Sequence, residues 1–247
     1  MKFIRVSKLD EYHKNEIWDL YRKKYHTNRE RFFRGLPVDG TAVLFTGEHE
    51  HHIVGFFFLE TRVFKCRNKN HRVIFTSDLV ISKSYQGRRL AEIAGLIYFL
   101  KDKIFHPFST HYLFLAASSF VGCSLMIRNF KEFWPQPASK TPREMDLLKD
   151  TASDHYFGRF YEDYTKTAFL NPVPKFNPVG NPNNMDHRGY LEYYQDKLPE
   201  AEKGQALVCI APISRANFKS LCSQTLSGIL KKKAEKKWIE ETRNTWL

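Results

Sequence analysis

The most restrictive feature of this sequence is residues 79–91, LVISKSYQGRRLA, where an apolar run leads through a short polar turn into a helical pattern. Apolar side chains then recur three or four residues apart, at Leu90, Ile93, Ile97, Leu100 and Ile104. The sequence therefore predicts a strand, a glycine-bearing turn and an amphipathic helix in direct succession. The first N–H groups of a helix have no partner within it, and the helix dipole favours negative charge there. The turn, with Gln86, Arg88 and Arg89 as extra donors, is typical of an anion site such as one for pyrophosphate.

This turn resembles the acyl-CoA pyrophosphate loop of the GNAT N-acyltransferase superfamily, whose pattern is Gln/Arg-x-x-Gly-x-Gly/Ala. Gln86 matches the first position and Ala91 the last, whereas Arg89 stands where the family usually has glycine. The central glycine lets the backbone approach the phosphates closely, so Arg89 either bonds phosphate through its side chain or narrows the site. Gly87, one position after the glutamine, is also common in the family. The alternative is an ordinary strand–turn–helix with solvated arginines.

The predicted elements around the turn follow an order that is more specific than the turn itself. Alternating and apolar runs predict five strands, at residues 1–6, 41–46, 52–65, 72–82 and 112–117. Helical spacing predicts helices at residues 9–34, directly after the turn, and at 119–133. This is the element order of the GNAT core, so the resemblance covers about residues 1–135. It implies an α/β (α+β) fold with a mixed, mostly antiparallel sheet flanked by helices, and an acyl-CoA cleft where the fourth strand splays from the fifth.

The C-terminal part is expected to complete the same sheet. Residues 161–169 and 206–213 are apolar enough for two further strands, and Ser214 is a good N-cap for a final helix over residues 214–245. The long connection at residues 171–204 contains three Asn-Pro steps, and is either a lid over the acceptor side or a surface excursion. We therefore expect residues 1–247 to form one domain, with residues 136–247 as an extension of the core.

Composition indicates a globular protein, because 42% of the 247 residues are hydrophobic and 15% are aromatic. No apolar run reaches the roughly 18–20 residues that a membrane span needs. Residues 1–5 lack the apolar core of a signal peptide. The four cysteines form no Cys-x-x-Cys pair, so a zinc knuckle or disulfide framework is not expected. We expect a reduced, cytoplasmic protein.

The net charge of +12 favours anionic partners. Much of the excess lies in the last predicted helix, at Lys231, Lys232, Lys233, Lys236 and Lys237. Such a run is usually a solvated helix face, so nucleic acid binding is not expected, although a basic nucleic-acid-binding module remains the third hypothesis. The basic residues near the turn suit CoA, and the overall charge would also suit an acidic acyl carrier protein.

The GNAT resemblance implies how an acyl-CoA would be held. In that superfamily the pantetheine pairs with the fourth strand like an extra strand, and a backbone amide polarises the thioester carbonyl. On this chain those contacts fall to Leu79, Val80 and Ile81, whose amides would serve as oxyanion-type donors. The remaining implied cofactor contacts are Gln86, Gly87, Arg88, Arg89, Leu90 and Ala91 of the turn, and Ser119 after the fifth strand.

A general base is needed because the acceptor amine must lose a proton to attack. Asp78 directly precedes the cofactor-binding segment, where family members often place an acidic base or a water-holding residue. Glu60, near the end of the third predicted strand, is the second candidate. Either carboxylate needs a raised pKa or a water relay to act near neutral pH. The structural alternatives are a strand-edge carboxylate with a local hydrogen bond for Asp78 and an ordinary strand-end polar residue for Glu60.

The usual general acid is missing from the predicted site. Alignment on Ser119 puts Met126 where many family members have a tyrosine that protonates the leaving thiolate. Ser118, Ser119 and Ser124 can contact the pantetheine or, as serines near a helix often do, bond their own backbone. Water, Tyr161 or Tyr164 can take the acid role, or none is needed, because a thiol with a pKa near 8.5 is a tolerable leaving group.

Two other groups of residues, a possible metal site and a possible nucleophile, give weaker signals. His49, Glu50, His51 and His52 point to alternating faces if they continue a strand, so no metal site is expected there. Cys123 has no histidine nearby in sequence to activate it as a nucleophile. The leading hypothesis is an N-acyltransferase that uses acetyl-CoA or another acyl-CoA, and the acceptor and oligomeric state stay open. The rivals are a catalytically degenerate CoA- or partner-binding protein and an enzyme that uses a long-chain acyl-CoA or acyl carrier protein.

Overall fold

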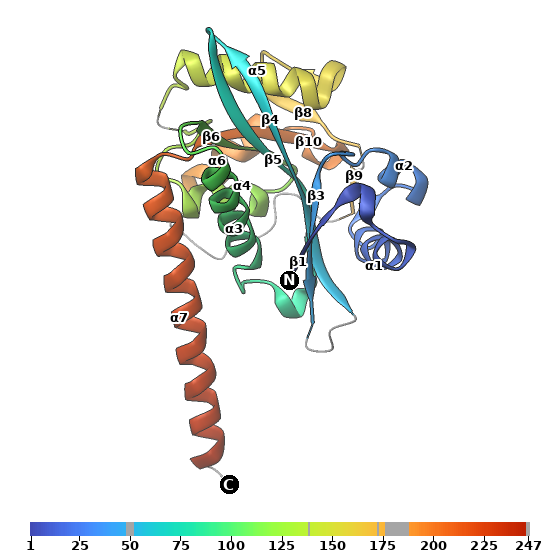
Figure 1. The fold of residues 1–247 in the computed structure, drawn as a ribbon, viewed down its shortest axis with the longest axis vertical. Coiled ribbons are helices and arrows are strands. Elements are labelled where there is room, and N and C mark those ends of the chain that lie inside the picture. Colours follow the sequence, from blue (N-terminus) through green and yellow to red (C-terminus); the bar gives the residue numbers. More distant parts are fainter. Residues whose placement is uncertain (48–51, 138, 172, 176–187, 246–247) are drawn as a thin grey trace.

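A computed structural model of the chain describes residues 1–47, 52–137, 139–171, 173–175 and 188–245. Its centre is an eight-stranded sheet with the order β1-β3-β4-β5-β6-β10-β8-β7 (Figure 1). The strands are β1 (Lys2–Arg5), β3 (Thr41–Thr46), β4 (Ile53–Cys66), β5 (Lys69–Ile81), β6 (Thr110–Ala117), β7 (Tyr161–Glu162), β8 (Thr167–Phe169) and β10 (Gln205–Pro212). The pair β5–β6 is parallel and the other six neighbouring pairs are antiparallel. The predicted mixed, mostly antiparallel sheet is confirmed.

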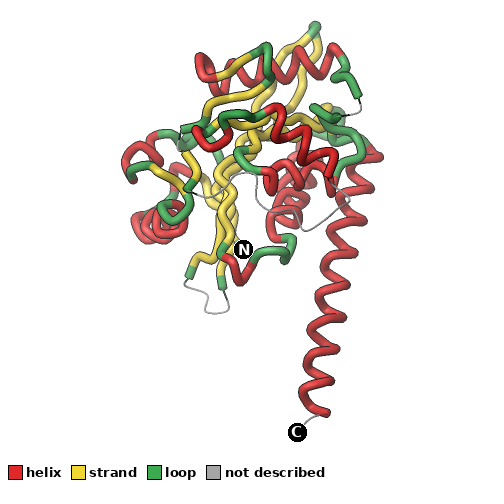
Figure 2. Tube along the Cα trace, turned by 180° about the vertical axis from the view of Figure 1, so that it is seen from behind, coloured by secondary structure: helices red, strands yellow, loops and turns green. Residues whose placement is uncertain are grey.

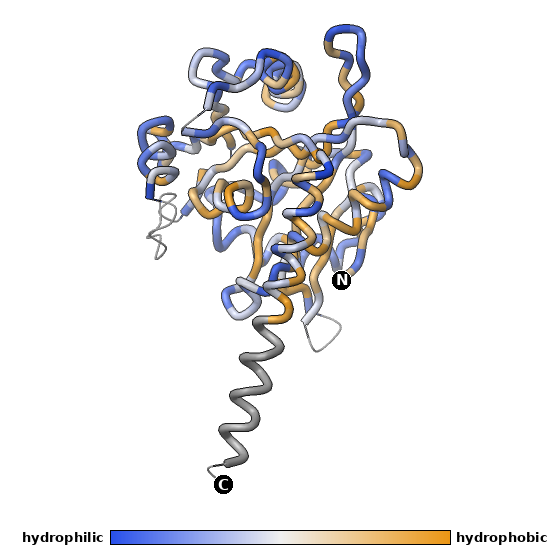
Figure 3. The backbone as a smooth tube through the Cα atoms, turned by 90° about the vertical axis from the view of Figure 1, so that its left-hand side faces the viewer, coloured by the Kyte–Doolittle hydropathy of each residue, from blue (hydrophilic) through white to orange (hydrophobic). Residues whose placement is uncertain are grey.

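Helices cover both faces of this sheet, as the view from behind shows (Figure 2). They are α1 (Glu11–Tyr21), α2 (Arg29–Arg34), α3 (Leu90–Phe105), α4 (Phe120–Asn129), α5 (Arg143–Phe157), α6 (Arg188–Lys197) and α7 (Arg215–Thr245). Apolar segments gather in the central strands and polar ones in the outer loops (Figure 3). This distribution is what burial of the strand side chains between two helical layers requires.

Side-chain alternation along the strands assigns each helix to a face. On β4, Phe56 and Phe58 pack in the cluster that contains residues of α1 and α2, and Phe64 packs with α5. The odd-numbered neighbours Phe57 and Leu59 face α3 instead. On β6 and β10, the side chains that point to this second face pack against α4 and α6. The sheet thus has α1, α2 and α5 on one face and α3, α4 and α6 on the other.

The predicted helix over residues 9–34 is wrong, because the segment is broken into three elements. Asp10 caps α1 by accepting a hydrogen bond from the His13 N–H at 2.8 Å, and Asn28 caps α2 in the same way. Between them lies the short strand β2 (Tyr25–His26), which pairs with β9 (Val173–Pro174). This pairing partner lies about 150 residues further along the chain, so local helical spacing could not indicate it.

The C-terminal part also differs from the prediction in detail. The connection at residues 171–204 contains β9 and the helix α6, and is therefore not a continuous loop. Residues 176–187, with two of the three Asn-Pro steps, lie outside the described residues, as does the hairpin tip at 48–51. The helix predicted to end at residue 133 ends at Asn129, since Phe130 is extended, the chain bends at residues 131–132 and Trp134 bridges to Ile210.

Strand β10 lies inside the sheet, between β6 and β8. It pairs with β6 from Leu207↔Ala117 to Pro212↔Tyr112. The helix α7 follows it and extends well beyond the body of the molecule (Figure 1). In the described part of the chain, no helix combines the length and apolar character required to cross a bilayer.

Candidate functional site

Strands β5 and β6 run side by side and then separate, and this separation is the centre of the candidate site. Their ladder ends, within the described residues, at Thr76↔Leu115. Beyond that point β5 continues on β4 to Ile81, while β6 continues on β10 to Ala117. The last part of β5 therefore has an edge without a neighbouring strand in the described chain. With the short β2 left out of the count, these are the fourth and fifth strands, and the predicted splay between them is confirmed.

The backbone of Ile81 faces this opening. The next residue, Ser82, donates its N–H to the Val54 carbonyl of β4 at 2.8 Å. Because backbone groups alternate in direction along a strand, those of Ile81 point the other way, toward β6. The Ile81 carbonyl accepts a hydrogen bond from Gln86 Nε2 at 3.0 Å. Gln86, a predicted cofactor contact, therefore also fastens the loop to the end of β5.

The strand carries a β-bulge at the start of the open edge. The ladder between β4 and β5 shifts register between Phe56 and Phe58, so that Asp78 and Leu79 stand opposite Phe57 alone. Asp78 has a φ of 55°, in the left-handed region that aspartate tolerates better than most residues. A bulge re-aims a side chain out of the regular alternation. Asp78 is re-aimed two residues after the last β5–β6 pair.

The Asp78 carboxylate is half-buried and has two side-chain partners. The Tyr21 hydroxyl donates a hydrogen bond to Oδ1 at 2.8 Å, and Ser77 supplies a second hydrogen bond. Burial raises the pKa of the Asp78 carboxyl above 3.8, while the two hydrogen bonds lower it in part. A raised pKa brings a carboxylate closer to what a general base near neutral pH requires.

A pair of tyrosines connects the two sides of the opening. The rings of Tyr21 and Tyr25 stack with centroids 4.6 Å apart. Burial and the Asp78 charge raise the pKa of Tyr25 to about 12, and Tyr25 shares a hydrogen bond with Ser118. Ser118 directly follows the last residue of β6. The aromatic pair therefore reaches from the bulge of β5 to the end of β6.

The strand pair β2–β9 fixes the position of the stacked Tyr21–Tyr25 pair. Tyr25 lies opposite Pro174 in the two-stranded ladder. The Lys175 N–H donates to the Lys24 carbonyl at 2.7 Å, and Lys175 Nζ donates to the Arg22 carbonyl at 2.9 Å. An N-terminal and a C-terminal segment thus meet beside the bulge.

The predicted phosphate loop forms the other end of the same segment. Lys83–Tyr85 make one 3₁₀ turn, Gly87 has a φ of 69°, and α3 begins at Leu90. Glycine adopts this φ without the steric penalty that other residues incur. The N-cap residue Arg89 makes no side-chain capping hydrogen bond. The first N–H groups of α3, at Leu90 and Ala91, are therefore left without a side-chain cap.

Arg89 has a backbone conformation typical of glycine, and its side chain connects neighbouring helices. Its φ is 56°, in the left-handed region, where the family pattern has glycine. The guanidinium donates to Asn129 Oδ1 of α4 at 3.3 Å and lies 3.6 Å from Glu92 Oε1 of α3. Only 19% of the side chain is exposed. It also lies against Gly228 of α7. Arg89 is thus held among three helices.

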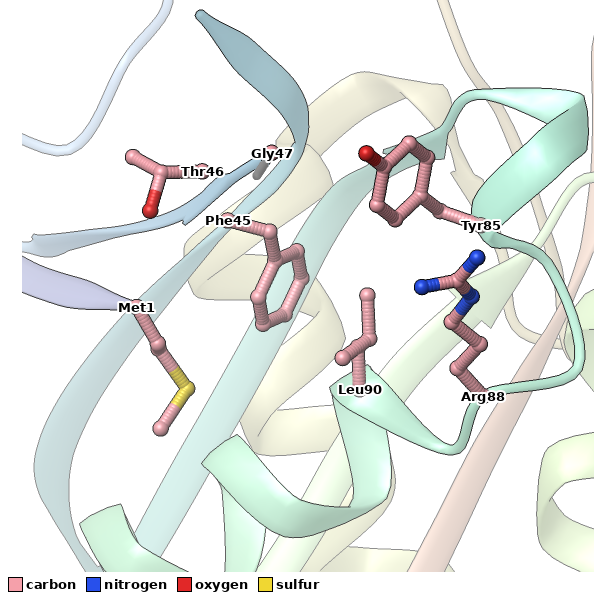
Figure 4. Close-up of a pocket in the computed structure, with 7 residues that line it drawn as sticks. All are labelled: Met1, Phe45, Thr46, Gly47, Tyr85, Arg88 and Leu90. Atoms are coloured by element: carbon pink, nitrogen blue, oxygen red, sulfur yellow. The ribbon is translucent and has the colours of Figure 1, made fainter. Parts of the chain in front are cut away.

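Arg88 faces a small pocket beside the loop (Figure 4). Its guanidinium lies over the Tyr85 ring, 4.4 Å from the centroid. The pocket has a volume of about 230 Å³ and is lined by Met1, Phe45, Thr46, Gly47, Tyr85, Arg88 and Leu90. Since Met1, directly before β1, and the end of β3 supply its other wall, it lies on the side of the loop away from β6. The pocket is therefore separate from the opening between β5 and β6.

Glu60 is placed differently from Asp78. It lies in the middle of β4, opposite Phe75, and is 6% exposed. Its Oε1 accepts a hydrogen bond from Arg62 Nε at 2.6 Å. The buried Tyr156 hydroxyl of α5 has no hydrogen-bond partner among the described residues. Glu60 and Asp78 belong to the same strand pair, but the structure brings only Asp78 to the open edge of β5.

The residues considered for the acid role are engaged elsewhere. Met126 is fully buried in the core of α4 and α6. The Ser119 hydroxyl caps α4 by accepting from the Gly122 N–H at 3.2 Å. Tyr161 donates to Asp150 Oδ1 at 2.6 Å on β7, the far edge strand, and Tyr164 is fully exposed. No residue at these positions offers a proton donor at the opening.

The stacked pair of Tyr21 and Tyr25 could not be predicted, because residues 9–34 were expected to form one helix. Their aromatic spacing was visible, but their contact with Asp78 depends on the bulge and on β9. Of the proposed histidine-rich cluster at 49–52, only His52 is described, and it pairs with Glu16 at 2.7 Å. The described residues contain no group of three side chains suited to a metal ion.

Comparison with known proteins gives distant likenesses. No family model matches the sequence, and no curated protein matches it. Among solved structures, NAA60 from Arabidopsis thaliana in complex with a bisubstrate analogue aligns at 15% identity over 53% of this chain and 86% of its own, with a TM-score of 0.39. An aminoglycoside 6'-N-acetyltransferase complexed with coenzyme A aligns at 10% identity over 87% of this chain and 98% of its own, with a TM-score of 0.38.

A third structure, the tetramutant BH1408 protein from Bacillus halodurans, aligns at 13% identity over 57% of this chain and 99% of its own, with a TM-score of 0.41. At these identities no substrate follows from the likeness. The element order, the splay after Thr76 and the glycine-bearing turn before α3 are features of this chain itself. Together they make its fold GNAT-like.

Proposed function

We propose that this protein is an acyl-CoA-dependent N-acyltransferase, with acetyl-CoA as the first donor to test and an amine as the acceptor. One observation carries the proposal. A single segment, from the bulge of β5 to the start of α3, has a carboxylate with a raised pKa at one end and an uncapped helix start at the other. Between them runs a strand edge without a neighbour in the described chain. These three features suit a base, a thioester arm and a pyrophosphate in that order.

In the proposed reaction the amine nitrogen attacks the thioester carbonyl carbon directly. The backbone N–H groups at Leu79 and Ile81 stabilise the oxygen of the tetrahedral centre. Asp78 accepts the proton that the attacking nitrogen loses, directly or through water. The C–S bond then breaks and the amide and CoA thiolate leave. The pyrophosphate of CoA binds at residues 86–91.

The leaving thiolate takes its proton from water in this scheme. With Met126 buried in the core, the position of the family's tyrosine offers no donor. A thiol with a pKa near 8.5 leaves without full protonation in the transition state. The same observation favours a second candidate, a CoA-binding protein without turnover. A longer acyl chain or an acyl carrier protein is a variant of the first proposal.

The deciding experiment has two steps. Retention on CoA-agarose at moderate salt separates both candidates from a nucleic-acid-binding module. Release of free thiol from acetyl-CoA in the presence of a panel of amines then separates the enzyme from the non-catalytic binder. Binding without thiol release under any amine would leave the non-catalytic reading, and failure to bind CoA in any acyl form would end the proposal.

We also propose that residues 1–247 fold as one unit, in the cytoplasm. The support is that β10 pairs with β6 on one side and β8 on the other. A fragment of residues 1–149 would lack β10 and leave the apolar β6 edge open, so it is expected to aggregate. Size-exclusion chromatography checks this. A monomeric, CoA-binding fragment 1–149 would contradict the single unit.

A further inference from the structure

Two residues that are unusual for their local structure touch each other. Arg89 is a non-glycine residue in the left-handed conformation, directly before α3. Gly228 is a glycine in the interior of α7, where glycine is the least favourable residue after proline. A Cβ atom built on Gly228 would lie 2.8 Å from Cδ and 3.2 Å from Cγ of Arg89, and closer still to its Nε. The absence of a side chain at 228 is what makes room for Arg89.

The contact joins the predicted phosphate loop to two distant elements. Arg89 Nη1 reaches Asn129 at the end of α4, and its stem packs on Gly228. Glu92, which is 10% exposed, supplies the opposite charge within the first turn of α3. A side chain that is fixed at three points restrains the backbone from which it extends. In this case that backbone is the left-handed residue that ends the loop.

We infer that Arg89 is a positioning residue for cofactor binding, which sets the loop conformation by packing into the gap at Gly228, and that α7 thereby supports the loop. This inference rests on the proposed function for the identity of the ligand. In this inference the Arg89 side chain holds neighbouring helices together and does not contact a phosphate. The position of α7 and the affinity for CoA are then coupled through one side chain.

The test is a double-mutant cycle with Gly228→Leu, Arg89→Gly and the double variant. Leucine at 228 favours the helix but occupies the space of Arg89. It should weaken acetyl-CoA binding by about 10- to 100-fold, the scale of misplaced supporting residues. Turnover at saturating acetyl-CoA should change little. Arg89→Gly permits the left-handed turn but removes the side chain that holds it, so it should weaken acetyl-CoA binding to a similar extent, and the double variant should bind like either single variant.

Gly95→Leu in α3 is the matched control, because a Cβ atom there meets nothing within 4 Å. It should leave acetyl-CoA affinity unchanged. Gly228→Ala provides a milder variant should Gly228→Leu fail to fold, with a smaller loss in the same direction. Isothermal titration calorimetry gives the affinities, and steady-state kinetics separates KM from kcat.

Three results would overturn the inference. Wild-type affinity in Gly228→Leu would mean that the contact does not restrain the loop. A double variant whose loss of affinity is the sum of the two single losses would mean that α7 acts by another route. A salt-dependent loss of binding in Arg89→Gly alone would make Arg89 a phosphate ligand. Thermal melting of the same four proteins without ligand tests the Arg89–Gly228 coupling separately, so additive melting shifts would reject the contact even if the wild type bound no CoA.

Discussion

Asp78 and Arg89 lie at the two ends of the same segment and share nearly the same backbone conformation, with φ values of 55° and 56°. A left-handed conformation costs a non-glycine residue about 1–2 kcal/mol. At Asp78 the conformation belongs to a bulge that brings a carboxylate to the opening between β5 and β6. At Arg89 it precedes α3, and the side chain is held by α4 and α7.

The comparison shows that similar backbone strain can serve two purposes. Strained residues often gather at functional sites, but the strain alone does not say which part of the residue is used. For Asp78 the side chain is the proposed chemical group. For Arg89 the proposed use is the backbone, and the side chain keeps that backbone in place. Substitutions at the two ends should therefore separate chemistry from binding.

The largest expected effect is at the bulge. Asp78→Asn keeps the shape and tolerates the left-handed conformation, but it cannot accept the proton. Turnover should fall by about 10²–10⁴-fold, the usual scale for a lost general base, with acetyl-CoA binding retained. Steady-state kinetics together with calorimetry measures both. Glu60→Gln is the control, and a larger loss in Glu60→Gln than in Asp78→Asn would transfer the role to Glu60.

The next effect is at the loop. Gly87→Val forces a β-branched residue to a φ of 69°, which should destabilise the fold by about 1–2 kcal/mol and remove the rise in melting temperature that acetyl-CoA causes. Gly158→Val is a matched control, since Gly158 also has a positive φ, 51°, but lies at the end of α5. Its ψ of −127° is less accessible still to valine, so this variant should lose at least as much stability and yet keep the ligand-induced shift. Equal loss of the shift in both variants would show that the loop has no special part in binding.

A smaller effect concerns pH. The hydrogen bond from Tyr21 lowers the pKa of Asp78 against the larger opposing effect of burial. Tyr21→Phe removes that hydrogen bond, so the pKa should rise and the acidic limb of kcat/KM should move to higher pH. Phe keeps the ring that stacks on Tyr25. An unchanged pH–rate profile in Tyr21→Phe would separate Asp78 from the titrating group.

The raised pKa of Asp78 also predicts an effect on the free energy of unfolding. Its pH dependence is opposite to that of a salt-bridged carboxylate, whose pKa is lowered. Because the folded pKa of Asp78 lies above 3.8, the folded state holds a proton that the unfolded state has lost between the two values. Stability contributed by this group is therefore present below 3.8 and decreases as pH rises through the folded pKa. Above that range Asp78→Asn should melt at a higher temperature than wild type, and the difference should disappear in acid. Calorimetric melting as a function of pH checks this.

Regular elements were predictable where their signals were local. The strand at residues 41–46 was predicted with its observed bounds, and the predicted strand at 52–65 contains three phenylalanines, at 56–58, that are buried in the core. The glycine-bearing turn before α3 could be identified because the apolar spacing changes from that of a strand to that of a helix within a few consecutive residues. The apolar stripe of α3 is partly exposed, since Ile97, Leu100 and Ile104 are 42%, 41% and 75% exposed. Spacing predicted the helix, but not how much of it the sheet covers.

The remaining features depend on partners that are distant in sequence. The bulge at Asp78 arises from the register of β4 against β5, and nothing in the residues near Asp78 specifies it. The strand β2 exists because β9 pairs with it. Gly228 is one of several small residues in α7 by sequence, and only the position of Arg89 gives it a role. Asp78 could be proposed from the resemblance, whereas Tyr21, Tyr25 and Gly228 required the folded chain.

The position of β10 in the sheet also sets an order of events during synthesis. One neighbour of β6 is made before it, but the other, β10, begins at Gln205, 88 residues after Ala117. At about 5–20 residues per second, a ribosome needs roughly 4 to 18 s to make that stretch. For those seconds one edge of β6 has no partner from its own chain. Misassembly with other chains is therefore most favoured late in translation, just before the last strand emerges.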